Sequence, residues 1–555
     1  VHNLQFTFRW DKPLAQYCSA CDKEWIGNNR YDWAWIYEVH MLNRDYMYQC
    51  MYLYLATGKR QYADYIRTML WDYAGKYAGW FEHNSGRKAT DQHSGKAFAQ
   101  SLDEANWATK VAMAYMAIKP VLSKEEVKAI EEGYLQPAAT LLLHRPAGAN
   151  WQMWHNSGLA ALGIALENDS IVDVAINKDK YGYHYLIGKH KNSDGWINEG
   201  SPHYHYYPLE ALLFTANAVK CRGIKLFDKD LHDMFVEPVK GTYPDLSFPA
   251  HSDGWYGANL LSQSALYEVG NARYNDPFLK RVLELTYAQK KRLDPEALLS
   301  NQLIKASEES LLQKSYSFDT SGFCLLRSDT RTVVLKFGGE GIGHGHPDKL
   351  SITIHDGKNE LVSDFGTSGY GVPDYLKWYK RTLSHNTVTV DAKDQKRSVG
   401  KLLKFNPRSD GGYAEAETTT AYPGVRMKRS LDLKGTHLQD VYTCTSDSSH
   451  LYEYVILFNE KPLMDGQPTA TTLTGSEVHE RIHNIFSYPH KSGFTCRTSS
   501  ASVQFDIPEG EVMEVVLGEA SGIPANPTVK DGPGAGDVAV KPCYPLIIRM
   551  KGKAM

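Results

Sequence analysis

The residues best suited to chemistry lie around the stretch GIGHGHPDK, where His344 and His346 flank Gly345. Five of the nine residues from 338 to 346 are glycine, so the backbone allows the two imidazoles to point the same way or to diverge. Asp364 and His385 follow after steps of 18 and 21 residues. Two histidines and one carboxylate form a three-ligand set that suits a metal, and zinc above others. The alternative is that these side chains are unrelated surface groups.

A second candidate is Tyr204, in the stretch NEGSPHYHYYPLEAL. Ser201 is a good N-cap and Pro202 suits the first helical position, so Tyr204 is predicted in the first turn of a helix. The positive end of the helix dipole favours an anion there, which helps a tyrosine with an ordinary pKa near ~10 to act as a base. The alternative is that Tyr204, Tyr206 and Tyr207 are aromatic side chains that pack the helix.

Asn150 and His155 lie in the stretch GANWQMWHNSGLAALG, which is predicted to form a helix that begins near Asn150. Five residues separate the two by about 140° around an ideal helix, so they are not expected to face one ligand. Asn150 is therefore either a ligand-binding amide or an N-cap. His155 is either a second functional imidazole or a core histidine.

Two kinds of structure must hold these residues. Residues 1 to about 305 carry apolar side chains at three-to-four spacing, typical of helices, in stretches such as SLDEANWATKVAMAYMAI. Successive helical hairpins indicate an (α/α) toroid, although a bundle or a solenoid shares this pattern. After about Ser310 the chain changes to short β-branched runs between Gly, Asp and Asn turns, with Asp356-Gly357 in a predicted hairpin. We predict an incomplete toroid over residues 1–308 and an antiparallel β-sandwich over residues 309–555.

The composition argues against several classes of protein. The chain has 61 basic and 64 acidic side chains and a net charge of -3, so no overall basic field points to nucleic acid. No run of about 18 apolar residues predicts a membrane span. The P-loop and G-x-S-x-G patterns are absent. The 35 tyrosines and 12 tryptophans suit stacking on sugar rings in a carbohydrate cleft, and they also suit ordinary packing.

The eight cysteines are scattered, and only Cys18 and Cys21 have C-x-x-C spacing. We expect mostly buried small side chains rather than a four-thiolate zinc site. The chain opens at VHNLQFTFRW, without the basic and apolar regions of a targeting segment. Either the protein is cytosolic, or such a segment has been removed. Nothing in the pattern predicts an oligomeric state.

Several stretches together, in one order, resemble the heparinase II/III superfamily of polysaccharide lyases, and within it the heparan-sulfate lyase (heparinase III) branch. They are WIYEVHMLNRDYMYQCMYLYLATGKRQYA, NWQMWHNSG, DGWINEGSPHYHYYPLEALL, GHGHPDKLSITI, LVSDFGTSGYG and YKRTLSHNTVTVD. The resemblance covers most of the chain. It implies a helical toroid joined to a β-sandwich with the active site between them. It also implies β-elimination from an acidic, uronic-acid-containing polysaccharide, and hence a periplasmic or secreted location.

The resemblance further implies roles for individual residues. Asn150 neutralises the uronate carboxylate, which acidifies the C5 proton. Tyr204 takes that proton and returns one to the C4 leaving oxygen, with His344 as the partner acid/base across the cleft. A divalent metal, expected to be zinc, supports the catalytic loop and is bound by His346, Asp364 and His385. The further candidates for substrate contact are Gln100, His155, Glu199, Tyr379 and Arg381.

Two features leave the substrate open. Some relatives have a histidine directly after the asparagine, where this chain has Trp151, and the stretch QSLDEANW from Gln100 resembles alginate lyases. The basic stretches KDQKRSVGK and KWYKR favour a sulfated glycosaminoglycan. The leading prediction is a heparin or heparan-sulfate lyase, and the alternative is an alginate or hyaluronan/chondroitin lyase. Outside the lyases, the alternatives are a glycoside hydrolase that uses carboxylates such as Asp194 and Glu199, and a non-catalytic glycan-binding protein.

Overall fold

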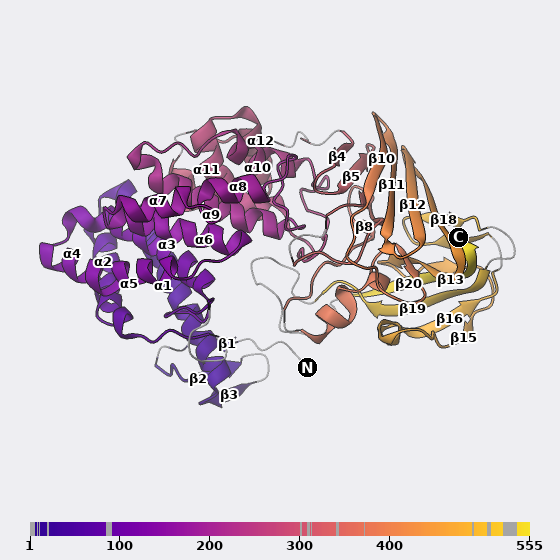
Figure 1. The fold of residues 1–555 in the computed structure, drawn as a ribbon, viewed down its shortest axis with the longest axis horizontal. Coiled ribbons are helices and arrows are strands. Elements are labelled where there is room, and N and C mark those ends of the chain that lie inside the picture. Colours follow the sequence, from indigo (N-terminus) through magenta and orange to yellow (C-terminus); the bar gives the residue numbers. More distant parts are fainter. Residues whose placement is uncertain are drawn as a thin grey trace.

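The computed structural model places an N-terminal helical part beside a C-terminal β-part (Figure 1). The predicted order, helices first and antiparallel strands second, is confirmed. The structure describes all residues except 1–5, 8, 10, 19–21, 85–91, 300–301, 308–310, 312–313, 340–342, 371, 491–492, 508–511 and 525–540.

The helical part starts with a small antiparallel sheet of β1 (Phe6–Thr7), β2 (Ala15–Cys18) and β3 (Lys23–Ile26). The α-helices that follow are α1 (Asn29–Thr57), α2 (Arg60–Ala74), α3 (Ser101–Ile118), α4 (Lys124–Ile130), α5 (Gln136–Leu143), α6 (Ala149–Ala165), α7 (Asp169–Asn177), α8 (Tyr183–His190), α9 (His203–Val219), α10 (Lys229–Val239), α11 (Ser264–Tyr274) and α12 (Pro277–Gln289). Helix α6 packs against both α3 and α9. A Cβ at Gly158 of α6 would lie 3.3 Å from the Ala105 carbonyl oxygen of α3 and 2.8 Å from Leu142 Cδ1, so glycine permits this close packing.

The β-part is built on one large antiparallel sheet. Its main path runs β15-β16-β19-β20-β13-β8-β7-β6-β5-β4, and β10, β11 and β12 extend from β13 on a branch. The strands of the part are β4 (Tyr316–Phe318), β5 (Phe323–Arg327), β6 (Thr332–Lys336), β7 (Ser351–His355), β8 (Glu360–Val362), β9 (Val388–Val390), β10 (Lys401–Arg408), β11 (Gly411–Tyr422), β12 (Val425–Lys434), β13 (His437–Phe458), β14 (Leu463–Met464), β15 (Thr469–Ala470), β16 (His483–Tyr488), β17 (Phe494–Arg497), β18 (Ser502–Phe505), β19 (Val512–Ser521) and β20 (Pro542–Ala554). The predicted hairpin is present as β7 and β8, in which Ile354 faces Val362.

Strand β13 joins the two regions of the sheet because it is 22 residues long. Its first half pairs with β12, and its second half pairs with β20 and β9. Buried and less buried residues alternate along β12, as expected for a strand with one face on a core. A second sheet of β14, β17 and β18 completes the part, and its Phe494 and Cys496 share a hydrophobic cluster with Ile456 of β13 and Val515 of β19.

The junction between the parts is packed rather than open. The predicted boundary at residues 308–309 falls outside the described residues. Just after it, Phe318 and Phe323 pack edge-on against Trp196 of the helical part, with ring centroids 5.8 and 5.7 Å away. Asp194 also accepts hydrogen bonds from the backbone N–H and the hydroxyl of Ser321. Asp194 therefore holds the two parts together, which gives it a structural role in place of the hydrolase role considered above.

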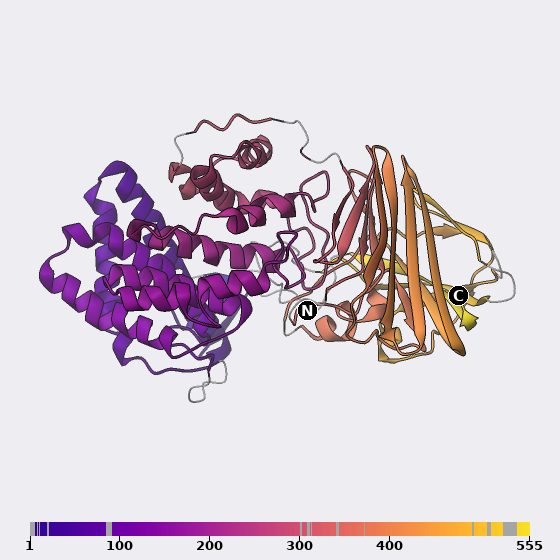
Figure 2. The ribbon, with the colours of Figure 1, turned by 45° about the horizontal axis from the view of Figure 1, so that its top comes forward.

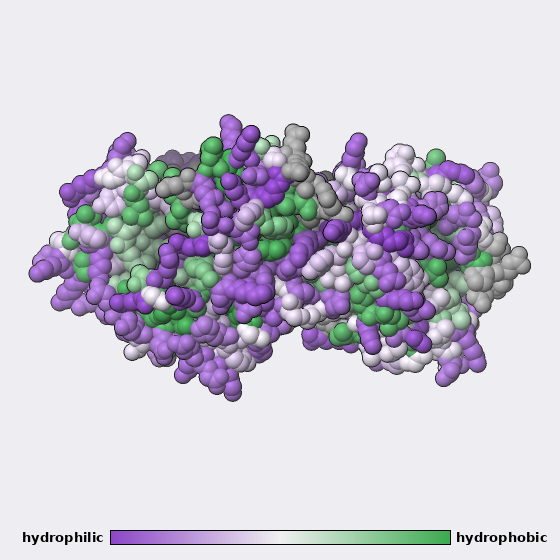
Figure 3. All heavy atoms as spheres, turned by 90° about the horizontal axis from the view of Figure 1, so that it is seen from above, coloured by the Kyte–Doolittle hydropathy of each residue, from purple (hydrophilic) through white to green (hydrophobic). Residues whose placement is uncertain are grey.

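The view in Figure 2 shows the helical layers and the fan of long strands on opposite sides of this junction. Figure 3 shows a largely hydrophilic face with apolar side chains in small groups. Among the described residues, no helix is long and apolar enough to span a bilayer. The described cysteines Cys324, Cys444, Cys496 and Cys543 are buried thiols, as predicted, whereas Cys221 is exposed.

Candidate active site

Tyr204 lies in the first turn of α9, as the sequence predicted. The helix begins at His203, slightly later than the N-cap pattern suggests, but Ser201 Oγ still accepts a hydrogen bond from the Tyr204 backbone N–H at 3.3 Å. The neighbouring Tyr206 is buried and hydrogen-bonds with Tyr267, so the packing interpretation holds for Tyr206. The Tyr204 hydroxyl instead meets the hydroxyl of Tyr370 at 2.6 Å.

His344 completes a compact group that we call the hydroxyl cluster, consisting of Tyr204, Tyr370 and His344. The His344 ring stacks on the Tyr204 ring, with centroids 3.6 Å apart and an angle of 17° between the planes. His344 Nδ1 lies 2.9 Å from the Tyr370 hydroxyl. The Tyr370 hydroxyl is thus within hydrogen-bonding distance of both predicted acid/base groups, so a proton can pass among the three.

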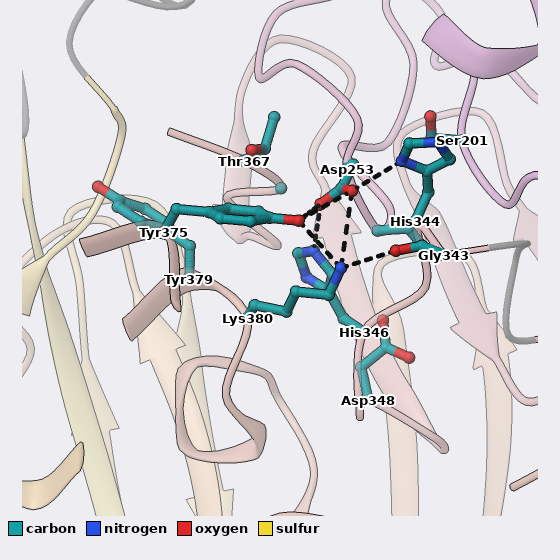
Figure 4. A network of polar contacts seen from close by, with 12 residues as sticks. Ser201, Asp253, Gly343, His344, His346, Asp348, Thr367, Tyr375, Tyr379 and Lys380 are labelled. Carbon is teal, nitrogen blue, oxygen red and sulfur yellow. Dashed lines mark hydrogen bonds and ion pairs between the residues drawn. The ribbon is translucent and has the colours of Figure 1, made fainter. Parts of the chain in front are cut away.

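Asp253 contacts this cluster, and Figure 4 shows its carboxylate linked to His344, Tyr375 and Lys380. Its Oδ2 is 3.0 Å from His344 Nδ1 and accepts a hydrogen bond from Tyr370, while its Oδ1 is 2.9 Å from His346 Nε2. Tyr375 also donates its hydroxyl hydrogen to this carboxylate, at 2.8 Å. Burial raises the pKa of Asp253, but the hydrogen bonds from His344 and His346 outweigh burial and hold the pKa well below its usual range.

The pKa of Tyr204 differs from what its position at the start of a helix predicts. The helix dipole was expected to favour an ionised Tyr204, yet burial raises the pKa of Tyr204 and the hydrogen bond to Tyr370 lowers it only in part. Burial likewise raises the pKa of Tyr370, as does the nearby Tyr204. Both phenols are therefore protonated in this arrangement, and Tyr204 can accept a proton only after its own has left through a partner.

Asn150 lies at the start of α6 and is buried, with its amide turned to Glu199. Asn150 Nδ2 donates to Glu199 Oε2 at 2.6 Å, and the Asn150 backbone N–H donates to Oε1 at 3.1 Å. Glu199 Oε2 is also 3.7 Å from His344 Nε2. Burial raises the pKa of Glu199, while the Asn150 side chain and His344 act to lower it. The structure thus brings Asn150, Glu199, Tyr204 and His344 together.

Two other predicted contacts in the helical part lie apart from this group. His155 is fully buried within α6, and burial lowers its pKa to about 4, so it is a neutral core histidine. Gln100 is exposed at the N-cap position of α3, and its carbonyl oxygen accepts the Glu104 backbone N–H at 3.1 Å. The hydrogen bonds found among the described residues link neither side chain to the hydroxyl cluster.

Two predicted contacts in the β-part have other partners in the structure. Tyr379 is 3% exposed, and its hydroxyl donates to the Gly522 carbonyl oxygen at 2.9 Å, so it serves the core and not the substrate. Figure 4 shows Tyr379 and Tyr375 pointing in opposite directions, with Tyr375 directed at Asp253. Arg381 Nε donates to Asp394 at 2.6 Å, so its guanidinium is engaged by an acid of the same domain rather than by Tyr204.

The candidate metal ligands form a second, buried group. Oxygen or nitrogen atoms of Asp348, Asp364 and His385 all lie within 4.8 Å of one another. The His346 ring is 5.3 Å from the His385 ring. We call these four residues the buried cluster. Asp348 was not predicted, although it stands only two residues after His346 in the same motif.

The polar atoms of the buried cluster indicate which residues suit a metal. His346 Nδ1, Asp364 Oδ2 and both ring nitrogens of His385 are buried without a hydrogen-bond partner among the described residues. Asp348, by contrast, pairs with the ammonium of Lys336 and lies 3.4 Å from that of Lys349. The atoms without a hydrogen bond belong to His346, Asp364 and His385, and His385 Nδ1 and Asp364 Oδ2 face each other at 3.3 Å. Such buried imidazole and carboxylate atoms suit a divalent cation.

The loops that carry these residues are fixed by close backbone contacts. Gly366 has φ +60°, and a Cβ there would come 2.0 Å from the Gly254 carbonyl oxygen, so only glycine fits. The Thr367 N–H donates to the same oxygen at 3.0 Å. This contact holds the loop after Asp364 against the loop of Asp253. On the other side, Lys380 Nζ donates to the Gly343 carbonyl oxygen at 3.0 Å and so restrains the glycine-rich loop.

Models of two known protein families match separate segments of the chain. Residues 39–236 match the model of the alginate lyase family, and residues 311–499 match the heparinase II/III-like C-terminal family. The segment similar to alginate lyases thus precedes the segment similar to the heparinase II/III-like C-terminal family. This pairing confirms the predicted resemblance to the heparinase II/III superfamily.

Individual relatives of the heparinase II/III-like chain carry different names. An alginate lyase of Stenotrophomonas maltophilia is 29% identical over 76% of this chain and 63% of its own length. A heparin-sulfate lyase of Bacteroides stercoris is 26% identical over 43% of this chain and 35% of its own length. The structure of the heparan sulfate lyase HepC from Pedobacter heparinus superimposes with a TM-score of 0.59 at 16% identity, covering 96% of this chain and 76% of that one. The chain thus spans just under two thirds of the length of the alginate lyase that it matches.

Proposed function

We propose that the protein is a polysaccharide lyase that cleaves a uronic-acid-containing polymer by β-elimination. The observation that carries the proposal is the hydroxyl cluster, because it places a tyrosine hydroxyl and an imidazole in contact at the start of α9. Asn150 lies beside it, and its side-chain amide carries a second N–H, besides the one donated to Glu199, that can bind a substrate carboxylate. The carbohydrate-lyase names of the relatives support the same reaction class.

The reaction uses these residues in a fixed order. The Asn150 amide hydrogen-bonds to the uronate carboxylate, which stabilises the negative charge that develops when the C5 proton leaves. Tyr204 removes that proton after its own proton has passed through the Tyr370 hydroxyl to His344 Nδ1, and the Asp253 carboxylate stabilises the imidazolium that forms. The electron pair of the C5–H bond forms the C4–C5 double bond, and the C4–O bond breaks. A tyrosine hydroxyl then protonates the leaving oxygen.

Two substrates are supported by different observations. Heparin or heparan sulfate is favoured by the fold of the heparan sulfate lyase and by the basic stretches near the site. Alginate is favoured by an alginate lyase relative that matches 76% of the chain and by the alginate lyase model over residues 39–236. Both are uronic-acid polymers, and the proposed chemistry is the same for each.

We also propose that His346, Asp364 and His385 hold a zinc ion. Two imidazoles and one carboxylate with buried unpartnered atoms are a donor set that zinc prefers. When bound, the metal would supply a rigid anchor for the loop that carries His344. Asp253 accepts a hydrogen bond from His346 Nε2 and so orients the ring, which leaves Nδ1 directed at the metal. Metal analysis of the purified protein tests this, and a zinc content well below one per chain would contradict it.

Because such polymers are found outside the cytosol, we propose a periplasmic or secreted location. Fractionation of the native host would test it, and recovery of the protein with the cytosol would contradict it.

The reaction is tested by digesting a panel of heparin, heparan sulfate, alginate, hyaluronan and chondroitin sulfate. We expect at least one digest to gain the ultraviolet absorbance of a double bond conjugated to the uronate carboxylate. Release of reducing ends without this absorbance would indicate hydrolysis, and binding without any product would indicate a glycan-binding protein. The size profile of the products also distinguishes internal cleavage from cleavage at a chain end.

A further inference from the structure

A basic segment runs alongside the loop that carries His344. It covers residues 393–401, KDQKRSVGK, and we call its exposed cations the basic ridge, consisting of Lys393, Lys396, Arg397 and Lys401. Lys393, Lys396 and Lys401 form no ion pair with any residue that the structure describes. The chain as a whole has a net charge of -3, so this segment is a local concentration of positive charge.

Hydrogen bonds fix the segment to both ends of the glycine-rich loop. At one end, the Gln395 side-chain oxygen accepts the Lys349 backbone N–H at 2.7 Å. At the other end, the Gly400 N–H donates to the Phe337 carbonyl oxygen at 2.8 Å. His344 lies between Phe337 and Lys349 in the chain, so the ridge flanks the loop of the hydroxyl cluster.

The carboxylates near the ridge already bind other donors. Asp394, the only acid within the segment, receives Arg381 Nε at 2.6 Å and the Thr382 backbone N–H at 2.8 Å. Glu417, which pairs with Lys401 across β10 and β11, binds Arg426. The three lysines are therefore available to an external anion. Their flexible ammonium groups act as point charges, which suits a polyanion better than a single planar group.

We propose that the basic ridge is a secondary subsite that binds the polyanionic substrate at some distance from the bond being cleaved, so that long chains are preferred over short oligosaccharides. The inference rests on the proposed lyase function. Eight residue steps separate Lys393 from Lys401, so the ridge spans at most about 28 Å. A polymer whose acidic groups repeat along its length can contact several of these lysines at once, whereas a short oligosaccharide bound at Tyr204 reaches few or none.

The test compares a triple variant K393Q/K396Q/K401Q with a control triple variant K178Q/K180Q/K220Q. The control removes exposed lysines of the helical part, near α7 and the end of α9, that form no ion pair with the described residues. For the ridge variant we expect KM for heparin or alginate polymer to rise by about tenfold and the salt dependence of KM to become shallower, because fewer counterions are exchanged on binding. We expect kcat to stay unchanged, and KM for a tetrasaccharide of the same polymer to stay within about twofold. The control should match the wild-type protein.

Binding is measured separately so that the subsite and the reaction can fail independently. Both triple variants are made in a Tyr204→Phe background, and their affinity for the intact polymer is measured by titration. Weaker binding by the ridge variant alone supports the subsite even if no polymer is ever cleaved. Equal binding by the ridge and control variants, or an equal rise in KM for the polymer and the tetrasaccharide, would overturn the subsite while leaving the lyase proposal intact.

Discussion

The Asp253 carboxylate contacts the hydroxyl cluster through one oxygen and the buried cluster through the other. Asp253 Oδ2 contacts His344 of the first, and Asp253 Oδ1 contacts His346 of the second. The first is open to solvent, with Tyr370 51% exposed, whereas His346 and His385 are at most 2% exposed. Two histidines separated by one glycine thus enter different environments. The GHGH stretch thus places one imidazole in the solvent-exposed cluster and the other in the buried one, which is the division that the proposed function requires.

The largest expected effect comes from removing the hydroxyl of Tyr204. Tyr204→Phe should lower kcat by about 10²–10⁴-fold, since the group that transfers the proton is lost. The ring and its stacking on His344 remain, so the melting temperature should change little. Initial rates from the ultraviolet assay, together with thermal unfolding, measure both. A fully active Tyr204→Phe variant would contradict the proposed mechanism.

Asp253→Asn should damage both clusters at once. The neutral amide cannot accept hydrogen bonds from both His344 and His346 as the carboxylate does, so kcat should fall. Metal affinity should also drop by about 10–100-fold, because the His346 ring loses the hydrogen bond that orients it. Loss of a buried charged acceptor should also cost about 1–3 kcal/mol of unfolding free energy. Denaturant titration, metal analysis and kinetics follow the three effects. A loss of activity with the metal affinity unchanged would show that Asp253 serves only the hydroxyl cluster.

The two histidines should separate cleanly by metal content. His346→Ala should lose bound metal, and His344→Ala should keep it, while both lose activity. His344→Ala serves as the matched control because it lies two residues away on the same loop. Elemental analysis of the two purified variants decides the matter, and equal metal loss in both would mean that GHGH forms one site.

The smallest effects are expected at Tyr379, the predicted contact that turned toward the core. Tyr379→Phe removes only the hydrogen bond to Gly522, so it should cost about 1 kcal/mol of stability and leave kcat/KM unchanged. Tyr375→Phe is the matched comparison in the same turn, and it should lower kcat because Asp253 loses a donor. If Tyr379→Phe instead raised KM strongly, the assignment of the two tyrosines would have to be exchanged.

Local sequence patterns were sufficient to predict much of this arrangement. Three-to-four spacing and the N-terminal pattern before Tyr204 gave the helices and the first turn of α9. Period-two runs gave the antiparallel β-part and the hairpin of β7 and β8. These features depend on residues close in the chain, and so a single sequence contains them.

The missed residues depend on contacts between distant segments. Asp253 lies in the loop SDGWYG and Tyr370 in GTSGYG, and neither stretch has a periodic pattern. Only the folded loops bring them within 3.0 Å of each other, 117 positions apart in the chain. One signal was present, because Tyr370 is flanked by glycine as His344 is, inside a stretch already singled out for Asp364. Tyr379 is the opposite case, because a substrate contact was predicted for its side chain, which instead points into the core.

The central claim, that this site performs elimination and not hydrolysis, is tested most directly by digestion in heavy-oxygen water. Mass spectrometry of the products from the polymer that is cleaved then shows where the oxygen comes from. Elimination predicts new ends that are lighter than hydrolysis products by one water and that contain no heavy oxygen from the cleavage step. Heavy oxygen incorporated at each cleaved bond would contradict the account, because it would show that water attacks the sugar.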